Sequence, residues 1–174
     1  MRTTGIVRRI DELGRVVIPK EIRKTMRIKE GEEMEVIVQD DTLVLKKYSP
    51  VKNVTELSKE YCEALGKNTG YTCLVCDTDD IIAASGQKDR FLNKKISKAL
   101  ENFLRARKSG YLRKGESFSL TPGDASADVA IAPIVSCGDV VGGMILTSDS
   151  PMTRTENCIK LLEVGASFFA NRIF

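Results

Sequence analysis

The chain has 174 residues, of which 42% are hydrophobic, and its 27 Lys/Arg and 24 Asp/Glu give a formal net charge of +3. This length and composition suit one or two globular domains and exclude a disordered chain. No apolar run in the sequence approaches the ~20 residues that a membrane span needs. The sequence has no His, which is the commonest general base and metal ligand. We therefore expect that the protein is not an enzyme, that it has no catalytic residues and that it binds no metal.

The net charge hides a separation of sign at the start of the chain. Residues 1–29 contain nine Lys/Arg against three Asp/Glu, whereas residues 30–45 contain six Asp/Glu and no base. A basic cluster is often only a solvated surface, but this segregation of acids and bases favours a basic face that binds nucleic acid.

The first 48 residues read as short strands separated by turns. Residues 5–10 and 15–18 are expected to be strands around a turn at 11–14, and Pro19 suits the start of a short helix. Residues 34–39 and 42–47 are expected to pair as a hairpin across Asp40-Asp41.

The apolar side chains of this small N-terminal segment need another element or chain to bury them. It has no Phe or Trp, and its strands are apolar on both faces rather than alternating. Since no disulfide or metal signal accompanies it, we expect a partner chain, and an intertwined dimer is the simplest arrangement.

After a linker at 49–53, the pattern changes to longer elements. We expect helices and strands in the order helix, two strands, helix, strands, helix, which is an α+β domain with helices packed on an antiparallel sheet. The expected helices are 54–67, 93–108 and 155–172, and the expected strands are 71–77, 81–85, 129–135 and 140–147. Gly142-Gly143 reads as a bulge or a tight helix-on-sheet contact.

Two features of this second segment leave alternatives open. Cys73-x-x-Cys76 lies in an expected strand, where the two thiols point to opposite faces, so buried core thiols are favoured over a metal or redox site. The five Cys are unevenly spaced, which fits a reducing cytoplasm. The polar stretches 86–90 and 109–128, with a short edge strand at 117–120, either roof a small-molecule pocket or are solvated connections.

Residues 4–50 carry a close resemblance to a known family. Their sequence, TGIVRRIDELGRVVIPKEIRKTMRIKEGEEMEVIVQDDTLVLKKYSP, resembles the AbrB-type swapped-hairpin DNA-binding domain of bacterial transition-state regulators. The resemblance implies that two chains interlace their strands into one β-barrel dimer on double-stranded promoter DNA. It also implies the DNA-binding residues, which are Arg8, Arg9, Arg15, Arg23 and Lys24.

The remainder resembles a GAF-like domain, so the chain is expected to join domains 1–50 and 54–174. Regulators of this kind activate or repress late sporulation genes in the forespore, and they assemble as tetramers. The resemblance implies no cofactor, although a GAF-like domain suits an unidentified small-molecule effector. Candidate contacts between copies are Leu57, Tyr61 and Leu65 on the first helix and Leu162, Phe169 and Ile173 on the last, unless both stripes pack on their own sheet. The alternative function is an antitoxin-like or other regulator whose C-terminal domain is only an oligomerisation scaffold.

Overall fold

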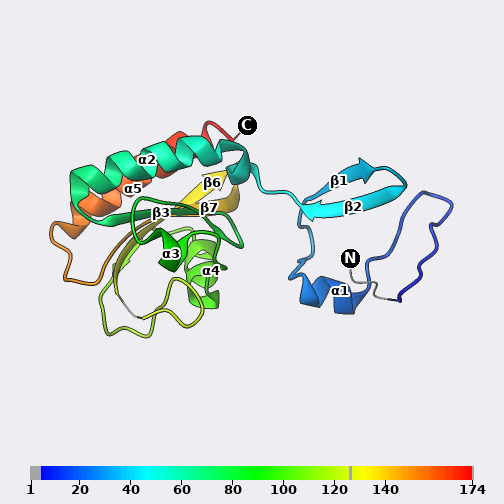
Figure 1. Ribbon diagram of the computed structural model, residues 1–174, viewed down its shortest axis with the longest axis horizontal. Helices are drawn as coiled ribbons and strands as arrows, with labels where there is room; N and C mark the ends of the chain where they lie inside the picture. Colours follow the sequence, from blue (N-terminus) through cyan, green and yellow to red (C-terminus); the bar gives the residue numbers. More distant parts are fainter. Residues whose placement is uncertain (1–4, 126, 174) are drawn as a thin grey trace. The chain divides into compact units, whose positions relative to one another are not determined.

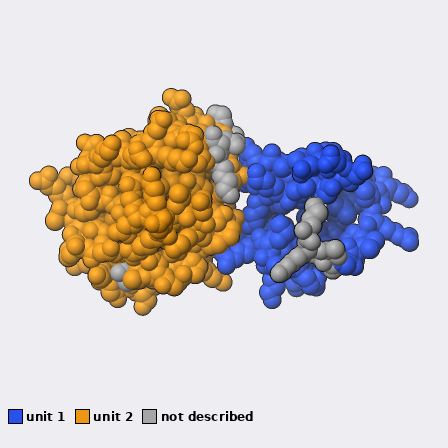
Figure 2. All heavy atoms as spheres, in the orientation of Figure 1, with its two compact units in different colours: residues 1–48 blue, residues 49–174 orange. Residues whose placement is uncertain are grey.

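The computed structural model describes residues 5–125 and 127–173 and divides the chain into two compact units. Residues 1–48 form unit 1 and residues 49–174 form unit 2 (Figure 1, Figure 2). Unit 1 contains the helix α1 (Lys20–Thr25) and a hairpin of two antiparallel strands, β1 (Met34–Gln39) and β2 (Thr42–Lys47). The predicted helix and hairpin are therefore confirmed.

The hairpin has the geometry that its turn residues favour. Gln39 pairs with Thr42 at the turn, and Asp40 has a φ of 51°, in the left-handed region that Asp tolerates better than most residues. The helix follows Pro19, whose fixed φ is compatible with a helix start.

The strands predicted at 5–10 and 15–18 are wrong for the single chain, because no strand is assigned to either segment. Within the described residues, unit 1 forms only the two-stranded sheet β1–β2, and no closed barrel. A strand requires a ladder of hydrogen bonds to a neighbour, and among the described residues neither segment is part of a strand pair.

Unit 2 is built on a five-stranded antiparallel sheet with the order β4-β3-β7-β6-β5. The helices α2 and α5 cover one face, and α3 and α4 lie against the other (Figure 1). The strands are β3 (Thr72–Cys76), β4 (Ile81–Ala84), β5 (Gly110–Leu112), β6 (Asp128–Ser136) and β7 (Asp139–Ser148), and the helices are α2 (Thr55–Thr69), α3 (Lys88–Phe91), α4 (Lys98–Arg105) and α5 (Thr155–Ala170).

Three predictions for unit 2 need correction. The expected linker contains a short 3₁₀ helix, Pro50–Val54, whose Val51 is fully buried in the core. The helix expected at 93–108 begins only at Lys98, because the Ser97 hydroxyl caps it by accepting a hydrogen bond from the Leu100 N–H at 3.0 Å. The edge strand is β5, which pairs with β6, rather than residues 117–120.

The two faces of the sheet bury separate cores. Cys73 belongs to the core under α2 and α5, whereas Cys76 belongs to the core under α3 and α4, as the alternation of a strand predicts. Burial raises the pKa of Cys76, so this thiol stays protonated. The predicted tight helix-on-sheet contact at Gly142-Gly143 is confirmed, since a Cβ on Gly143 would lie 2.5 Å from a Leu104 methyl, and the β6–β7 register shifts beside Gly142, between its pair with Ile134 and the pair Val135–Val140.

The predicted contact stripes on the first and last helices pack on their own sheet instead. Leu65, Leu162 and Phe169 are buried in the core under α2 and α5, and Ile173 is buried there as well. Leu57 and Tyr61 are partly buried against the same core. The four buried side chains are therefore covered by their own unit, whereas Leu57 and Tyr61 keep part of their surface exposed.

Candidate nucleic-acid interface

A charged turn organises the start of unit 1. The carboxylate of Asp11 accepts hydrogen bonds from the backbone N–H of Leu13 at 3.0 Å and of Arg15 at 2.8 Å, and from Nε of Arg15 at 2.7 Å. The Asp11 N–H donates to the Arg15 carbonyl at 3.0 Å, and Gly14 has a φ of 75°, in the left-handed region that Gly adopts readily. Asp11 therefore fixes the backbone beside Arg15 and holds its guanidinium.

This turn should weaken in acid. The hydrogen bonds from Arg15 lower the pKa of Asp11, so the carboxylate is more acidic in the folded chain than in the unfolded one. The contribution of the Asp11 carboxylate to the turn is then fully present above about pH 4 and is lost as pH falls through the lower folded-state value. We predict that the ¹⁵N-amide resonances of Leu13 and Arg15 titrate together, with a midpoint below about 3.9.

Asp11→Asn provides the control for this titration, because the amide cannot ionise but still offers an acceptor oxygen. The coupled shift of both amides should disappear in the variant. A midpoint at or above about 3.9 in the parent protein would contradict the lowered pKa.

The other predicted DNA-binding residues are exposed on unit 1. Arg8 and Arg9 lie in the segment before the turn, and Arg23 and Lys24 lie on α1, none of whose residues is buried. In the part of the chain that the structure describes, no ion pair involves any of these four side chains. These four side chains can therefore pair with an external anion, whereas the Arg15 guanidinium already forms an ion pair with Asp11.

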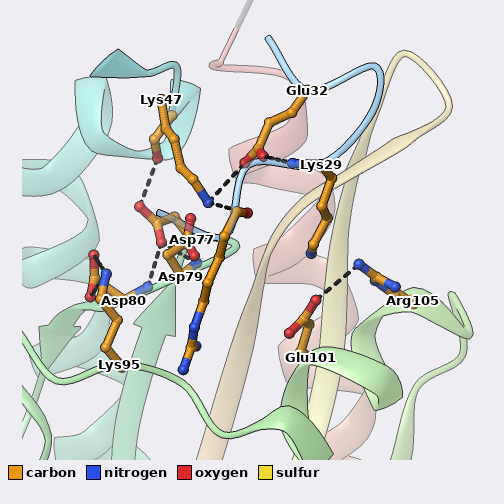
Figure 3. A network of polar contacts seen from close by, with 11 residues as sticks. Lys29, Glu32, Lys47, Asp77, Asp79, Asp80, Lys95, Glu101 and Arg105 are labelled. Atoms are coloured by element: carbon orange, nitrogen blue, oxygen red, sulfur yellow. Dashed lines mark hydrogen bonds and ion pairs between the residues drawn. The ribbon is translucent and has the colours of Figure 1, made fainter. Parts of the chain in front are cut away.

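Part of the acidic segment is neutralised within unit 1. Lys47 Nζ lies 3.1 Å from Glu32 Oε1 and donates to the Arg27 carbonyl at 2.9 Å, and the Lys29 N–H donates to Glu32 Oε2 at 2.7 Å (Figure 3). Both side chains of the Lys47–Glu32 pair are mostly buried. This network joins β2 to the chain that follows α1, and it restrains the end of the helix that carries Arg23 and Lys24.

Unit 1 also exposes an unusual amount of apolar surface. Val7 is 86% exposed, Val17 is 72% exposed and Val38 is 75% exposed. The large apolar side chains of unit 1 with exposed surface are Ile6, Val7, Ile10, Leu13, Val16, Val17, Met26, Val36, Val38 and Leu43. Such a concentration on so small a unit is typical of an interaction surface.

The sheet of unit 2 has a filled core under α3 and α4 and a groove beside α5. The space between the sheet and α3–α4 is filled by core side chains, among them Phe91, Leu100 and Ile131. A groove of about 570 Å³ runs beside α5, with Arg107 and Glu163 among its lining residues. The small-molecule effector stays a prediction, and this groove is its candidate site.

Two further findings concern the described residues as a set. Residues 5–125 and 127–173 contain no cluster of three His, Cys, Asp or Glu side chains that could hold a metal ion. No helix in the same residues is both long and apolar enough to cross a bilayer.

Sequence reasoning missed the roles of Asp11 and of the Glu32–Lys47 pair. The spacing Asp11-x-x-Gly14 was a usable signal, because an Asp at the start of a turn commonly accepts from the backbone two residues on. The Glu32–Lys47 pair joins residues 15 apart along the chain, and no local pattern indicates it. Arg2, one of the nine Lys/Arg counted in residues 1–29, lies outside the described residues.

Comparisons with known proteins identify both units. Residues 53–173 match the family model described as "Stage V sporulation protein T C-terminal, transcription factor". Residues 7–53 match the model described as "Antidote-toxin recognition MazE, bacterial antitoxin". Stage V sporulation protein T of Bacillus subtilis (strain 168) is 43% identical over 178 residues, covering 99% of this chain and 99% of its own.

Two other relatives each match one unit. The transition state regulatory protein AbrB of Bacillus subtilis (strain 168) is 56% identical over 50 residues, which are 29% of this chain and 52% of AbrB. The GAF domain of an Acinetobacter phosphoenolpyruvate-protein phosphotransferase is 12% identical, with a TM-score of 0.60, and the match covers 69% of this chain and 81% of that one. The second likeness shows that unit 2 has a GAF-like fold.

Proposed function

The chain belongs to the family of stage V sporulation protein T, and we propose that it acts as a homo-oligomeric regulator that binds promoter DNA of late sporulation genes in the forespore. In this proposal unit 1 binds the DNA, and unit 2 assembles the chains and responds to an effector. The observation that carries it is the set of exposed cations on unit 1, within the 50 residues that are 56% identical to AbrB.

The chemistry of these cations fits duplex DNA. Arg23 and Lys24 lie on one short helix, and Arg15 lies in a turn that Asp11 stiffens. Arginine forms paired hydrogen bonds with phosphate and with guanine in the major groove, so a rigid presentation favours specific contacts over loose charge attraction. Two copies of unit 1 would double the surface and suit a two-fold symmetric operator.

The apolar surface of unit 1 supports self-association. A second chain that paired with segments 5–10 and 15–18 would cover residues such as Val7, Val17 and Val38. The same pairing would supply a hydrogen-bond ladder to both segments. A tetramer requires a second contact, which we place in unit 2, where Leu161 and Val164 are exposed on α5.

Footprinting on sporulation promoters with the full chain tests the proposal. We expect one protected site, with binding that weakens steeply as salt rises. The logarithm of the binding constant should fall with the logarithm of salt by roughly 0.9 for each phosphate neutralised, which gives a slope of roughly −4 to −9 for a dimer with five candidate cations per chain. Equal affinity for promoter and random duplexes would contradict sequence-specific regulation.

The antitoxin alternative is less well supported. The MazE match spans residues 7–53, which lie mostly in unit 1. An antitoxin of this type is expected to continue into a disordered toxin-binding tail, whereas the present chain continues into a folded sheet with helices on both faces. Unit 2 therefore favours a regulator.

A further inference from the structure

Unit 2 has a charge separation of its own. Residues 86–116 contain ten Lys/Arg against three Asp/Glu, a balance of +7. The rest of unit 2 contains six Lys/Arg against twelve Asp/Glu, a balance of −6. The near-neutral charge of the whole unit therefore hides one strongly basic segment.

The fold places the two helices of this segment on one side of the sheet, whereas β5 is an edge strand and Arg107 lines the groove beside α5. Residues 86–116 include α3, α4 and β5, and both helices lie on the face opposite α2 and α5 (Figure 1). On α4, Leu100 and Leu104 are buried against the sheet, whereas Lys98 and Arg105 are exposed. Positions 98 and 105 are seven residues apart, so they share the outward stripe of the helix.

Some of these cations are paired and others are not. Lys95 lies 3.0 Å from Asp80, and Arg105 lies 2.9 Å from Glu101 on the same helix (Figure 3). In contrast, Lys94, Lys98 and Lys108 are exposed and take part in no ion pair within the described residues of the chain. These three lysines flank and cover α4, and we call them the α4 lysines.

The composition of this surface favours DNA over a protein partner. Protein interfaces depend on buried aromatic or aliphatic anchors and are depleted in Lys, whereas phosphate contacts need little more than cations. The large apolar side chains exposed in the described residues of unit 2 are Leu161 and Val164, and both lie on α5, over the other face of the sheet. The α4 lysines are therefore positively charged, and no large exposed apolar side chain of the described residues lies beside them on this face.

We propose that the α3–α4 face of unit 2 is a second, sequence-independent contact with the DNA backbone that flanks the operator. This proposal rests on the proposed function, because unit 1 must first bring the chain to DNA. The peptide link at residues 48 and 49 then raises the effective concentration of unit 2 near the flanking phosphates, to the order of millimolar for a short connection. Weak phosphate contacts become significant at such a concentration.

The test compares two duplexes with two triple variants of the full chain. One duplex contains the footprinted operator alone, and the other adds about 20 bp on each side, more than the span of one ~10 bp helical turn. The test variant is Lys94→Gln/Lys98→Gln/Lys108→Gln. The matched control, Lys59→Gln/Lys67→Gln/Lys160→Gln, removes the same charge from exposed positions on α2 and α5.

The parent protein should bind the long duplex more tightly than the short one, with a steeper salt dependence. The test variant should lose most of this gain, which we expect to be at least about 10-fold at 50 mM salt, because each phosphate contact adds roughly 0.9 to the slope. Its affinity for the short duplex should stay at the parent level, and the control variant should behave like the parent on both.

The possible failures are distinguishable. Equal binding of both duplexes by the parent, unchanged binding of the long duplex by the test variant, or an equal loss in the control variant would overturn the second contact. Failure of the parent to bind the short operator duplex specifically would instead overturn the proposed function of unit 1.

Discussion

Arg15→Ala and Arg23→Ala are each expected to weaken binding of the full chain to its operator by about 10- to 100-fold, while the protein stays folded and associated. Each substitution removes a guanidinium that can form two hydrogen bonds with guanine or phosphate, a contact worth about 1–3 kcal/mol. Both side chains are exposed, so their loss leaves no buried cavity. Direct binding titrations at several salt concentrations measure the effect.

The salt dependence separates two roles that affinity alone does not. If an arginine contacts phosphate, its removal from both chains of the proposed dimer should make the slope shallower by about 2 and weaken operator and random DNA alike. If it contacts a base, the loss should be larger on the operator than on random DNA. Arg23 on α1 suits base contact, and Arg15, already held by Asp11, suits a positioned phosphate contact.

Lys46→Ala is the matched control, because it removes an exposed cation of unit 1 that is not among the predicted DNA-binding residues. Lys46 lies on β2, with Nζ 3.9 Å from Glu35. Its loss should change operator affinity by less than about 3-fold, since exposed pairs contribute little and the residue lies outside the proposed surface. If Lys46→Ala matched the arginine variants, the assigned surface would be wrong.

In unit 1, the sequence predicts an element well where all the residues that hydrogen-bond to it belong to the same chain. The hairpin β1–β2 is an example, because its strands and its turn lie within 14 consecutive residues, Met34–Lys47. Segments 5–10 and 15–18 have the same β-branched character but are assigned no strand, and in the proposed dimer their hydrogen-bond ladder would come from the partner chain. Composition indicated that such a partner is needed.

In unit 2, local hydrogen bonding overrides periodicity. The apolar spacing through Ile96, Leu100 and Leu104 continues a helical pattern upstream of Lys98, yet the helix begins after Ser97, whose hydroxyl satisfies the N–H of Leu100. The DNA-binding residues came from resemblance, whereas the role of Asp11 became visible only with the hydrogen bonds of its turn.

Val17→Asp is expected to abolish the association of unit 1 and with it operator binding. Val17 is 72% exposed in the single chain, so the substitution causes no clash or buried charge within one unit. In the proposed dimer the same position is covered by the partner, and an uncompensated buried carboxylate costs about 3–5 kcal/mol. Operator affinity should fall by about 10²- to 10³-fold or more, and the mass of the assembly measured by light scattering should halve.

Gln39→Glu provides the control, because it adds one negative charge to an exposed polar position of the same unit without removing an apolar contact. It should keep the parent's mass and reduce operator binding by no more than about 3-fold, the range expected for a surface charge. Retention of the parent's mass and operator affinity by Val17→Asp would mean that the apolar surface of unit 1 remains open to solvent in the working protein. The intertwined dimer would then be wrong, although Arg15 and Arg23 could still bind DNA from separate chains. The combination of halved mass with lost binding therefore identifies association of unit 1 as the step that assembles the DNA-binding surface.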